Sequence, residues 1–307
     1  MDFMCSSYTN GAFPAVLAFG DSILDTGNNN FRMTVTRANF LPYGRDFPYH
    51  MPTGRFGNGK VLSDLVAEGL GVKDLLPPYH NMMLKGSELP TGVCFASGGS
   101  GLDKFTASIQ GVIHVQEQVT DYQNYIQKLS QQVGDAAQAK QILANAVTLI
   151  SIGNNDICHH IFCNSGQEIA IQYRNIHRSA HSLESYVHPG CLPGSRQMAG
   201  NLICLPNVNY GAKIFNQKLM NLVSKLSQSH PDAKFVYIDM YNSLLAVIDN
   251  PTQYGFTTAT PCCCSVMTPV PCMHSANHVF WDFAHPSEKA YKTVVPKIVS
   301  TIRSSLA

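Results

Sequence analysis

The residues best suited to chemistry are a serine near the start of the chain and an Asp/His pair near its end. Ser22 stands in Gly20-Asp21-Ser22, directly after a short apolar run, and Asp282 precedes His285 by three positions. A serine hydroxyl is a poor nucleophile unless an adjacent base takes its proton. Asp282 could hold one imidazole nitrogen of His285 while the other meets Ser22, which would activate the serine for attack on a carbonyl carbon. Because Asp-x-x-His occurs by chance in about one chain of this length in three, a surface ion pair is the alternative.

Two more polar turns follow apolar runs in the same way. Gly98-Gly99 comes after residues 93–96, and Gly153-Asn154-Asn155-Asp156 comes after residues 147–152. Each turn alone is weak evidence, since Asn and Asp commonly bond their own backbone in turns. In open α/β sheets, however, ligands bind beyond the carboxyl ends of the strands. Three such turns at successive strand ends therefore indicate one shared site.

These turns need a sheet to position them, and the hydrophobic pattern predicts one. We expect strands at 15–19, 93–96, 147–152 and 235–238, each a short apolar run. Apolar residues at helical spacing predict helices at 60–70, 114–132, 136–146, 207–230 and 291–306. Strands that alternate with helices are typical of a mostly parallel sheet covered on both faces. We therefore predict an α/β fold with a single domain over residues 14–303, preceded by a short extension at 1–13.

The composition limits the kinds of partner. The 307 residues carry 13% charged side chains and a formal net charge of +1. Near neutrality leaves no electrostatic footprint for nucleic acid, and the 45% hydrophobic content excludes a disordered chain. No apolar run approaches the roughly 20 residues that span a bilayer. The N-terminus lacks the positive segment and the apolar stretch of a signal peptide, so we expect none.

Several blocks of this sequence, taken together, resemble one known family. In chain order they are Phe19-Gly20-Asp21-Ser22, Asp25-x-Gly27-Asn28-Asn29-Asn30, Thr53-Gly54-Arg55-Phe56-x-Asn58-Gly59, Phe95-Ala96-Ser97-Gly98-Gly99-Ser100-Gly101, Ser151-Ile152-Gly153-Asn154-Asn155-Asp156 and Val279-Phe280-Trp281-Asp282-x-x-His285-Pro286. They are similar to the conserved blocks of the plant GDSL esterases/lipases of the SGNH hydrolase superfamily, and the branch of extracellular anther-type lipases fits best. The resemblance implies a three-layer α/β/α fold with a mostly parallel, flavodoxin-like sheet, and no cofactor.

The resemblance also implies a role for each matching residue. Ser22 would be the nucleophile, His285 the base and Asp282 its orienting carboxylate. The oxyanion would be bound by the backbone N–H groups of Ser22 and Gly99 and by the side-chain amide of Asn155, with Gly98 as the alternative to Gly99. The expected reaction is hydrolysis of a carboxylic ester, in a small molecule or a lipid, through an acyl-enzyme. Secretion is expected by resemblance, an intracellular location is the alternative because no signal peptide is visible, and the oligomeric state is open.

Between Asp156 and the turn Pro189-Gly190-Cys191 the sequence departs from the family. Members carry another hydrophobic strand there, but residues 174–183 contain no apolar run of strand length. We therefore expect a central strand to be missing or degraded, and the alternative function is an impaired member that only binds its ligand. The resemblance implies a Cys191–Cys204 disulfide and a second one between Cys272 and one of three consecutive cysteines at 262–264, with Cys264 as the candidate. Such bonds would require an oxidising compartment.

Two other patterns suggest different chemistry. Gly54-x-x-x-x-Gly59-Lys60 imitates a phosphate-binding loop, but Val61 stands where Ser or Thr should bind Mg²⁺. A zinc site is suggested by the interval between two histidines and by nearby cysteines, although seven residues separate those cysteines: Cys264, Cys272, His274 and His278. Similar groups are Cys158-His159-His160-x-x-Cys163 and His177 with His181. We expect loop cysteines and surface histidines here, and no metal.

Overall fold

Four parallel strands form the central sheet of the protein. The computed structural model describes residues 13–157, 180–184, 189–198, 200, 204–264 and 270–306. In spatial order the strands are β1 (Val16–Gly20), β2 (Val147–Ser151), β3 (Ala180–Glu184) and β4 (Phe235–Ile238). β1 and β2 are buried along their whole length, which explains why their sequences are almost continuously apolar instead of alternating. Every neighbouring pair is parallel, as predicted.

The segment at 93–96, predicted as a strand, lies beside β1 without becoming a regular strand. Cys94 forms a parallel bridge with Ala18, and the N–H group of Phe95 donates to the Ala18 carbonyl at 2.7 Å. Ser97 N–H then donates to the carbonyl of Gly20 at 2.9 Å. This extended segment therefore carries the Gly98-Gly99 turn to the carboxyl end of β1.

The expectation of a missing central strand is wrong. β3 lies between β2 and β4 and pairs with both, with Val147 opposite Ala180 and Phe235 opposite His181. The sequence argument looked for an apolar run, whereas this five-residue strand is specified by backbone pairing with neighbours from distant parts of the chain. It gives partners to backbone N–H and C=O groups that β2 and β4 would otherwise leave unpaired.

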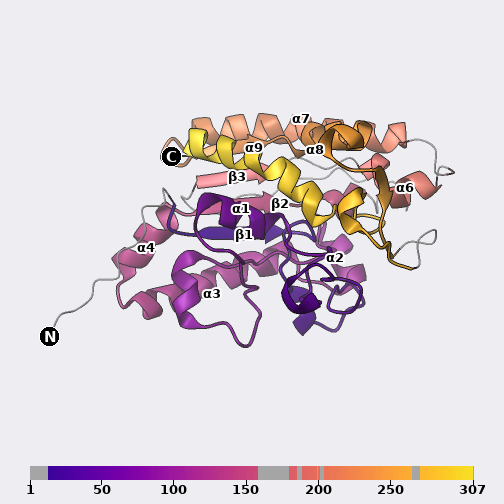
Figure 1. Cartoon of the computed structure of the whole chain (residues 1–307). Helices are drawn as coiled ribbons and strands as arrows, with labels where there is room; N and C mark the ends of the chain where they lie inside the picture. Colours follow the sequence, from indigo (N-terminus) through magenta and orange to yellow (C-terminus); the bar gives the residue numbers. More distant parts are fainter. Residues whose placement is uncertain are drawn as a thin grey trace.

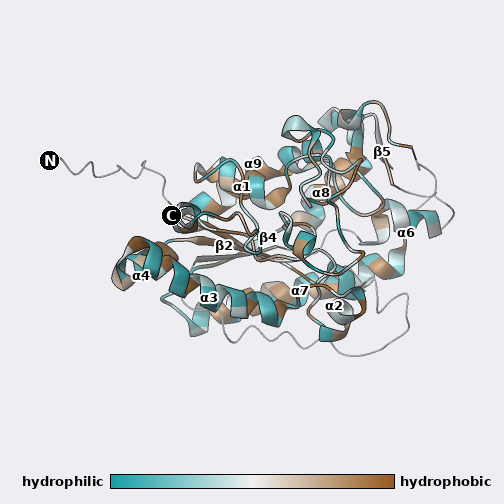
Figure 2. Ribbon diagram, turned by 90° about the horizontal axis from the view of Figure 1, so that it is seen from below, coloured by the Kyte–Doolittle hydropathy of each residue, from teal (hydrophilic) through white to brown (hydrophobic). Residues whose placement is uncertain are grey.

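Helices cover both faces of the sheet (Figure 1, Figure 2). On one face lie α1 (Leu62–Leu70), α8 (Met240–Asp249) and α9 (Glu288–Leu306), whose buried side chains share one hydrophobic cluster. On the other face, in a second cluster, lie α3 (Val115–Val133), α4 (Ala136–Ala144) and α7 (Pro206–Ser229). The three-layer α/β/α prediction is confirmed. The pattern did not predict α8, the short helices α2 (Lys104–Gln110) and α6 (Pro193–Met198), or a small sheet of β5 (Thr258–Pro261) and β6 (His278–Phe280).

The long helix α7 shows how its apolar pattern becomes packing. Phe215, Leu219 and Val223, spaced four residues apart, are buried in the hydrophobic cluster that α7 shares with α3 and α4, whereas Ile214 is 41% exposed. The apolar stripe is therefore part of the core, as expected for a helix that covers a parallel sheet. Within the part of the chain that the structure describes, no helix combines the length and the apolar character needed to cross a membrane.

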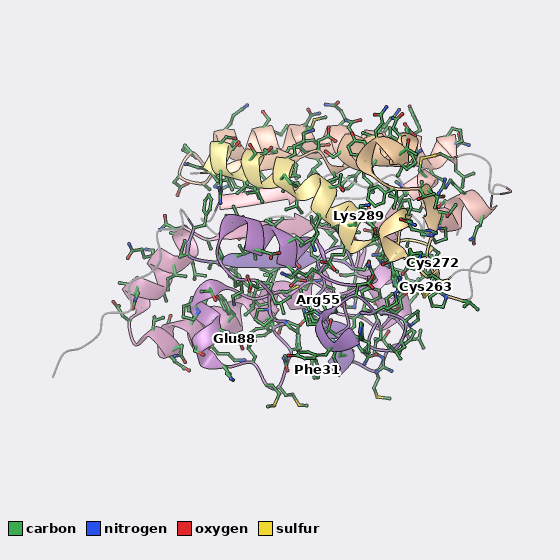
Figure 3. All side chains as sticks on the ribbon, viewed as in Figure 1. Phe31, Arg55, Glu88, Cys263, Cys272 and Lys289 are labelled. Atoms are coloured by element: carbon green, nitrogen blue, oxygen red, sulfur yellow. A yellow bond between two sulfur atoms is a disulfide. The ribbon has the colours of Figure 1, made fainter. Side chains whose placement is uncertain are left out.

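The described residues contain three disulfides, and one of them corrects an expected pairing. They are Cys191–Cys204, Cys262–Cys272 and Cys263–Cys264. Cys272 therefore bonds to Cys262, and the expected pair with Cys264 is wrong. The N–H group of Cys272 donates to the Cys262 carbonyl at 2.7 Å, and this contact brings the two Cα atoms to 4.9 Å. Figure 3 shows the labelled Cys263 and Cys272 close together beyond the lower end of α9.

These disulfides bear on the zinc alternative. Cys264 and Cys272 are both oxidised, so neither can supply the thiolate that a zinc site with His274 and His278 would need. The other suggested ligands fall outside the described residues, as does the side chain of His181: Cys158, His159, His160, Cys163 and His177. The same holds for nearly all of the expected N-terminal extension.

Candidate active site

The turn after β1 presents Ser22 at the carboxyl edge of the sheet. Gly20, the last residue of β1, has φ +134°, and a Cβ atom there would lie 1.7 Å from the carbonyl oxygen of Ser151 on β2. Only glycine fits this close approach of two strands. The buried amide of Gln118 on α3 fixes the same residue from the other side, accepting from Gly20 N–H at 2.8 Å and donating to Gly20 O at 2.9 Å. The chain therefore leaves the sheet in one defined direction just before Ser22.

Ser22, His285 and Asp282 converge although Ser22 and His285 are 263 residues apart. His285 Nε2 lies 2.8 Å from Ser22 Oγ, and His285 Nδ1 lies 2.8 Å from Asp282 Oδ2. Asp282 is fully buried, while Ser22 and His285 are 9% and 8% exposed. The carboxylate can therefore hold the Nδ1 proton, which leaves the Nε2 lone pair free to accept the serine proton. The alternative, a surface ion pair between Asp282 and His285, does not hold, because both side chains are buried and the imidazole contacts Ser22.

Hydrogen bonds keep Asp282 ionised. Its Oδ1 accepts the backbone N–H groups of Ala284 at 2.8 Å and His285 at 2.7 Å. Its Oδ2 accepts the hydroxyl of Tyr43 at 2.8 Å. Burial favours the neutral carboxyl, but the adjacent His285 and the hydrogen-bond donors outweigh it and lower the pKa of Asp282 below its usual 3.8. No pattern in the sequence pointed to Tyr43, which stands in a Pro/Gly-rich loop far along the chain from either motif.

The two backbone N–H groups that are expected to bind an oxyanion have no acceptor in the described part of the structure. Among the described residues, the N–H groups of Ser22 and Gly99 meet no hydrogen-bond acceptor. Gly98 N–H, in contrast, donates to Asp25 Oδ2 at 2.8 Å, which favours Gly99 over the alternative Gly98. Gly99 has φ +84°, a backbone conformation that residues with a side chain rarely adopt. Asn155 Nδ2 donates one hydrogen to Ser100 O at 2.9 Å and keeps its second hydrogen available.

Buried carboxylates tie the three polar turns together. Asp25 Oδ1 accepts from two backbone N–H groups of its own turn, while its Oδ2 holds Gly98. Asn154 Nδ2 donates to Asp21 Oδ2 at 3.0 Å, which joins the β2 turn to the β1 turn. Asp156 accepts from Leu102 N–H at 2.7 Å, which joins the β2 turn to the glycine turn. Burial is the main cause that raises the pKa of both Asp21 and Asp25 to about 6.

The segment that imitates a phosphate-binding loop has a structural role instead. Arg55, labelled in Figure 3, lies in the interior and donates from Nε and Nη2 to the two oxygens of Asp64, at 2.7 and 2.8 Å. The next residue, Phe56, packs its ring 5.2 Å from the ring of His285. This bidentate buried pair fixes the backbone that carries Phe56 against the imidazole of His285.

One cavity of about 460 Å³ contains these groups. Ser22, His285, Gly99 and Asn155 line it, and so do the polar residues Thr36, Arg37, Gln110 and Asn154. Its remaining wall is largely apolar and comes from several segments: Ile23, Val35, Phe40, Phe56, Leu192 and Phe283. A ligand that fits here has one polarised group at the serine and apolar substituents along the wall.

A second depression is larger but lacks a nucleophile. It measures about 900 Å³ and contains a contact of 2.7 Å between His80 Nε2 and Asp121 Oδ2. Among the described residues that line it there is no Ser, Thr or Cys that this histidine could activate. As far as its lining is described, this larger depression therefore lacks the arrangement of a histidine beside a serine hydroxyl that the smaller cavity contains.

Comparison with known proteins agrees with this geometry. Residues 16–298 match the family described as GDSL-like Lipase/Acylhydrolase. The chain is 49% identical to GDSL esterase/lipase At1g23500 of Arabidopsis thaliana over 314 residues, which are 96% of this chain and 91% of that protein. It is 46% identical to GDSL esterase/lipase At5g63170 of the same plant over 316 residues, 97% of this chain and 93% of that protein. With GDSL esterase/lipase EXL4 the identity is 41% over 329 residues, 99% and 96% of the two chains.

Proposed function

Since the chain belongs to the GDSL-like lipase/acylhydrolase family and is a hydrolase of carboxylic esters, we propose that Ser22 is its nucleophile. His285 is the general base and Asp282 orients it. The observation that carries this proposal is the 2.8 Å contact of His285 Nε2 with Ser22 Oγ, supported from behind by a fully buried carboxylate.

Acylation begins with a proton transfer. Ser22 Oγ attacks the ester carbonyl carbon while His285 Nε2 takes the hydroxyl proton. Asp282 stabilises the imidazolium that forms, and it stays ionised because its pKa is lowered. The tetrahedral intermediate then expels the alkoxide, which takes the proton from Nε2 and leaves as an alcohol. The acyl group remains on Ser22.

The developing oxyanion is bound by uncharged donors. We assign the Ser22 and Gly99 N–H groups and the second hydrogen of the Asn155 amide to this role, because all three adjoin the cavity and are not used by other acceptors. Such donors act most strongly on the charge that develops in the transition state. Water then attacks the acyl-enzyme, His285 takes its proton, and Ser22 regains that proton as the carboxylic acid leaves.

The wall of the cavity favours esters with an apolar chain. Most of the other lining residues are aliphatic or aromatic, and several of them are open to solvent: Val35 is 95%, Phe40 52% and Phe283 48% exposed. A chain that extends from the serine would bury apolar area on these side chains. We therefore propose an acyl ester of a small molecule or a lipid as substrate.

The alternative of an impaired, ligand-binding member has lost its premise, because β3 fills the position of the strand that was thought missing. The two functions are separated by hydrolysis of p-nitrophenyl butyrate with wild-type protein and Ser22→Ala. An esterase releases p-nitrophenol at a rate that Ser22→Ala abolishes, with an initial burst equal to the enzyme concentration when deacylation is the slower step. Equal, slow hydrolysis by both proteins would refute the proposed mechanism.

The disulfides support secretion as the proposed location. Disulfides persist in oxidising compartments and are rare where thiols are kept reduced. Among the described residues, Cys94 is the one cysteine outside a disulfide, and it is buried. Alkylation of native and reduced protein isolated from its source, followed by mass spectrometry, should find Cys191, Cys204, Cys262 and Cys272 modified only after reduction. Modification before reduction would favour an intracellular location.

A further inference from the structure

The side chain of Tyr43 contacts the triad from a loop with no catalytic motif. Its hydroxyl donates to Asp282 Oδ2 at 2.8 Å across 239 residues of sequence. We propose, on the basis of the function above, that Tyr43 is a positioning residue that fixes the carboxylate of Asp282 and through it the imidazole of His285.

The hydrogen bonds of Asp282 show why a further donor is needed. Oδ1 accepts two backbone N–H groups of its own turn and also lies 2.9 Å from His285 Nδ1. Oδ2 receives only the imidazole Nδ1–H of His285 and the hydroxyl of Tyr43 among the described residues. Without Tyr43, the sole group that fixes Oδ2 would be the ring that Asp282 is meant to orient. Tyr43 therefore sets the plane of the carboxylate independently of His285.

The fold holds Tyr43 in place. Its ring is 6% exposed and packs edge-on against Phe40 at 5.4 Å and against Phe56 at 6.3 Å. Its backbone N–H donates to Phe40 O at 3.1 Å, and Gly44 N–H donates to Gly57 O at 2.9 Å. The hydroxyl is thus anchored by a packed ring and a bonded backbone. Burial, together with the adjacent carboxylate of Asp282, raises the pKa of Tyr43, so the hydroxyl is a neutral donor throughout the working range.

Tyr43 also affects the charge that His285 experiences. A donor on Oδ2 withdraws negative charge from the side of the carboxylate that attracts the imidazolium. The other charged groups are Asp21 after β1, which interacts electrostatically with His285, and Arg37, which lines the same cavity as the imidazole; Asp282 lies on the turn of His285 itself. Replacing Tyr43 leaves all three in place. Loss of its hydroxyl should therefore strengthen the attraction of Asp282 for the imidazolium and move the acid limb of the activity profile to higher pH.

The test compares Tyr43→Phe with a matched control. Tyr125→Phe also removes one buried tyrosine hydroxyl, which donates to Leu89 O at 2.7 Å far from the cavity. For p-nitrophenyl butyrate, kcat of Tyr43→Phe should fall about 10- to 100-fold, as expected for one hydrogen bond to a charged group, with KM nearly unchanged. The acid limb of kcat/KM should move upward. Tyr125→Phe should keep the wild-type kcat and limb while its melting temperature falls.

A double-mutant cycle locates the effect. In an Asp282→Asn background, adding Tyr43→Phe should change kcat little further, because the group through which Tyr43 acts is already altered. Wild-type kcat and limb in Tyr43→Phe, or independent effects in the cycle, would overturn the positioning role. Equal rates for wild type and Ser22→Ala would instead refute the proposed function itself.

A variant that keeps the shape of the site guards against misfolding. 3-Fluorotyrosine placed at position 43 retains the ring and the hydroxyl, so it should fold, but its hydroxyl is a stronger hydrogen-bond donor. The acid limb should then move to lower pH, opposite to the shift in Tyr43→Phe. An unmoved limb in the fluorinated protein would refute the proposal even if Tyr43→Phe yielded no folded protein.

Discussion

The adjacent asparagines of the β2 turn provide a sharp test of the oxyanion site. Asn155 Nδ2 donates one hydrogen to Ser100 O at 2.9 Å, and its second hydrogen remains available in the cavity that Ser22 also lines. Asn154 Nδ2 instead donates to the buried carboxylate of Asp21 at 3.0 Å. We predict that Asn155→Ala removes a donor that acts in the transition state. Losing one such donor costs about 2.7–4 kcal/mol, so kcat should fall about 10²- to 10³-fold.

Asn154→Ala is the matched control, because it removes the same side chain one position earlier. It weakens the support of Asp21, which still accepts from Ile23 N–H at 3.1 Å. We expect a loss of stability of about 1–3 kcal/mol, as for a hydrogen bond to a charged group. The kcat of this variant should stay within about tenfold of wild type, since the donor that we assign to the oxyanion remains.

The assay should separate transition-state binding from substrate binding. Steady-state hydrolysis of p-nitrophenyl butyrate gives kcat and KM, and a trifluoromethyl ketone that adds to Ser22 reports on binding of the tetrahedral oxyanion. In Asn155→Ala the inhibition constant should rise by about the factor that kcat falls, with KM nearly constant. If Asn154→Ala loses as much kcat as Asn155→Ala, or if the ketone binds Asn155→Ala normally, the assignment of Asn155 is wrong.

Two further predictions concern the stability and the specificity of the site. Burial raises the pKa of Asp21 to about 6 from 3.8, so its ionised form destabilises the fold as pH rises between these values. Asp21→Asn also disturbs the bond from Asn154 at every pH, so the change that it causes in the free energy of unfolding should be more favourable at pH 7.5 than at pH 4, by about 2–3 kcal/mol. Urea unfolding at both values checks this, and an equal effect at both would contradict it. Phe40→Ser should raise KM for p-nitrophenyl octanoate several-fold but not for the acetate, because Phe40 lines the apolar wall of the cavity. Equal changes for both esters would show that the chain does not contact this wall.

Apolar patterns in the sequence predicted the helices and strands whose own residues form the hydrophobic core. β2 and β4 appear within one residue of their predicted ends, and α3 and α7 show the expected buried faces. β3 escaped prediction because its place depends on pairing with β2 and β4, which come from residues far from it along the chain. Local apolar pattern reports burial, and it cannot report the backbone pairing that specifies a short strand between two existing ones.

The candidate site shows the same division. Motif order identified Ser22, Asp282 and His285, yet only the fold could show whether residues 263 positions apart approach to 2.8 Å. Tyr43 could not be found, because a tyrosine in an irregular loop has no distinguishing spacing. The sequence alone also could not decide whether the Gly98 or the Gly99 N–H is the candidate donor. The choice depends on which of two adjacent N–H groups a carboxylate already occupies.

That carboxylate, Asp25, supports the neutral backbone donors that we assign to the proposed oxyanion site. Its burial raises its pKa to about 6, so the ionised side chain is held at an energetic disadvantage. In return it binds Gly98 N–H and two backbone N–H groups of the β1 turn, which fixes the glycine turn relative to Ser22. With Gly98 engaged, Gly99 lines the cavity and its N–H meets no acceptor among the described residues. Donors that need no reorganisation stabilise developing charge most effectively. If Gly99 N–H binds the oxyanion as we propose, the cost of burying Asp25 contributes to the rate of reaction at Ser22.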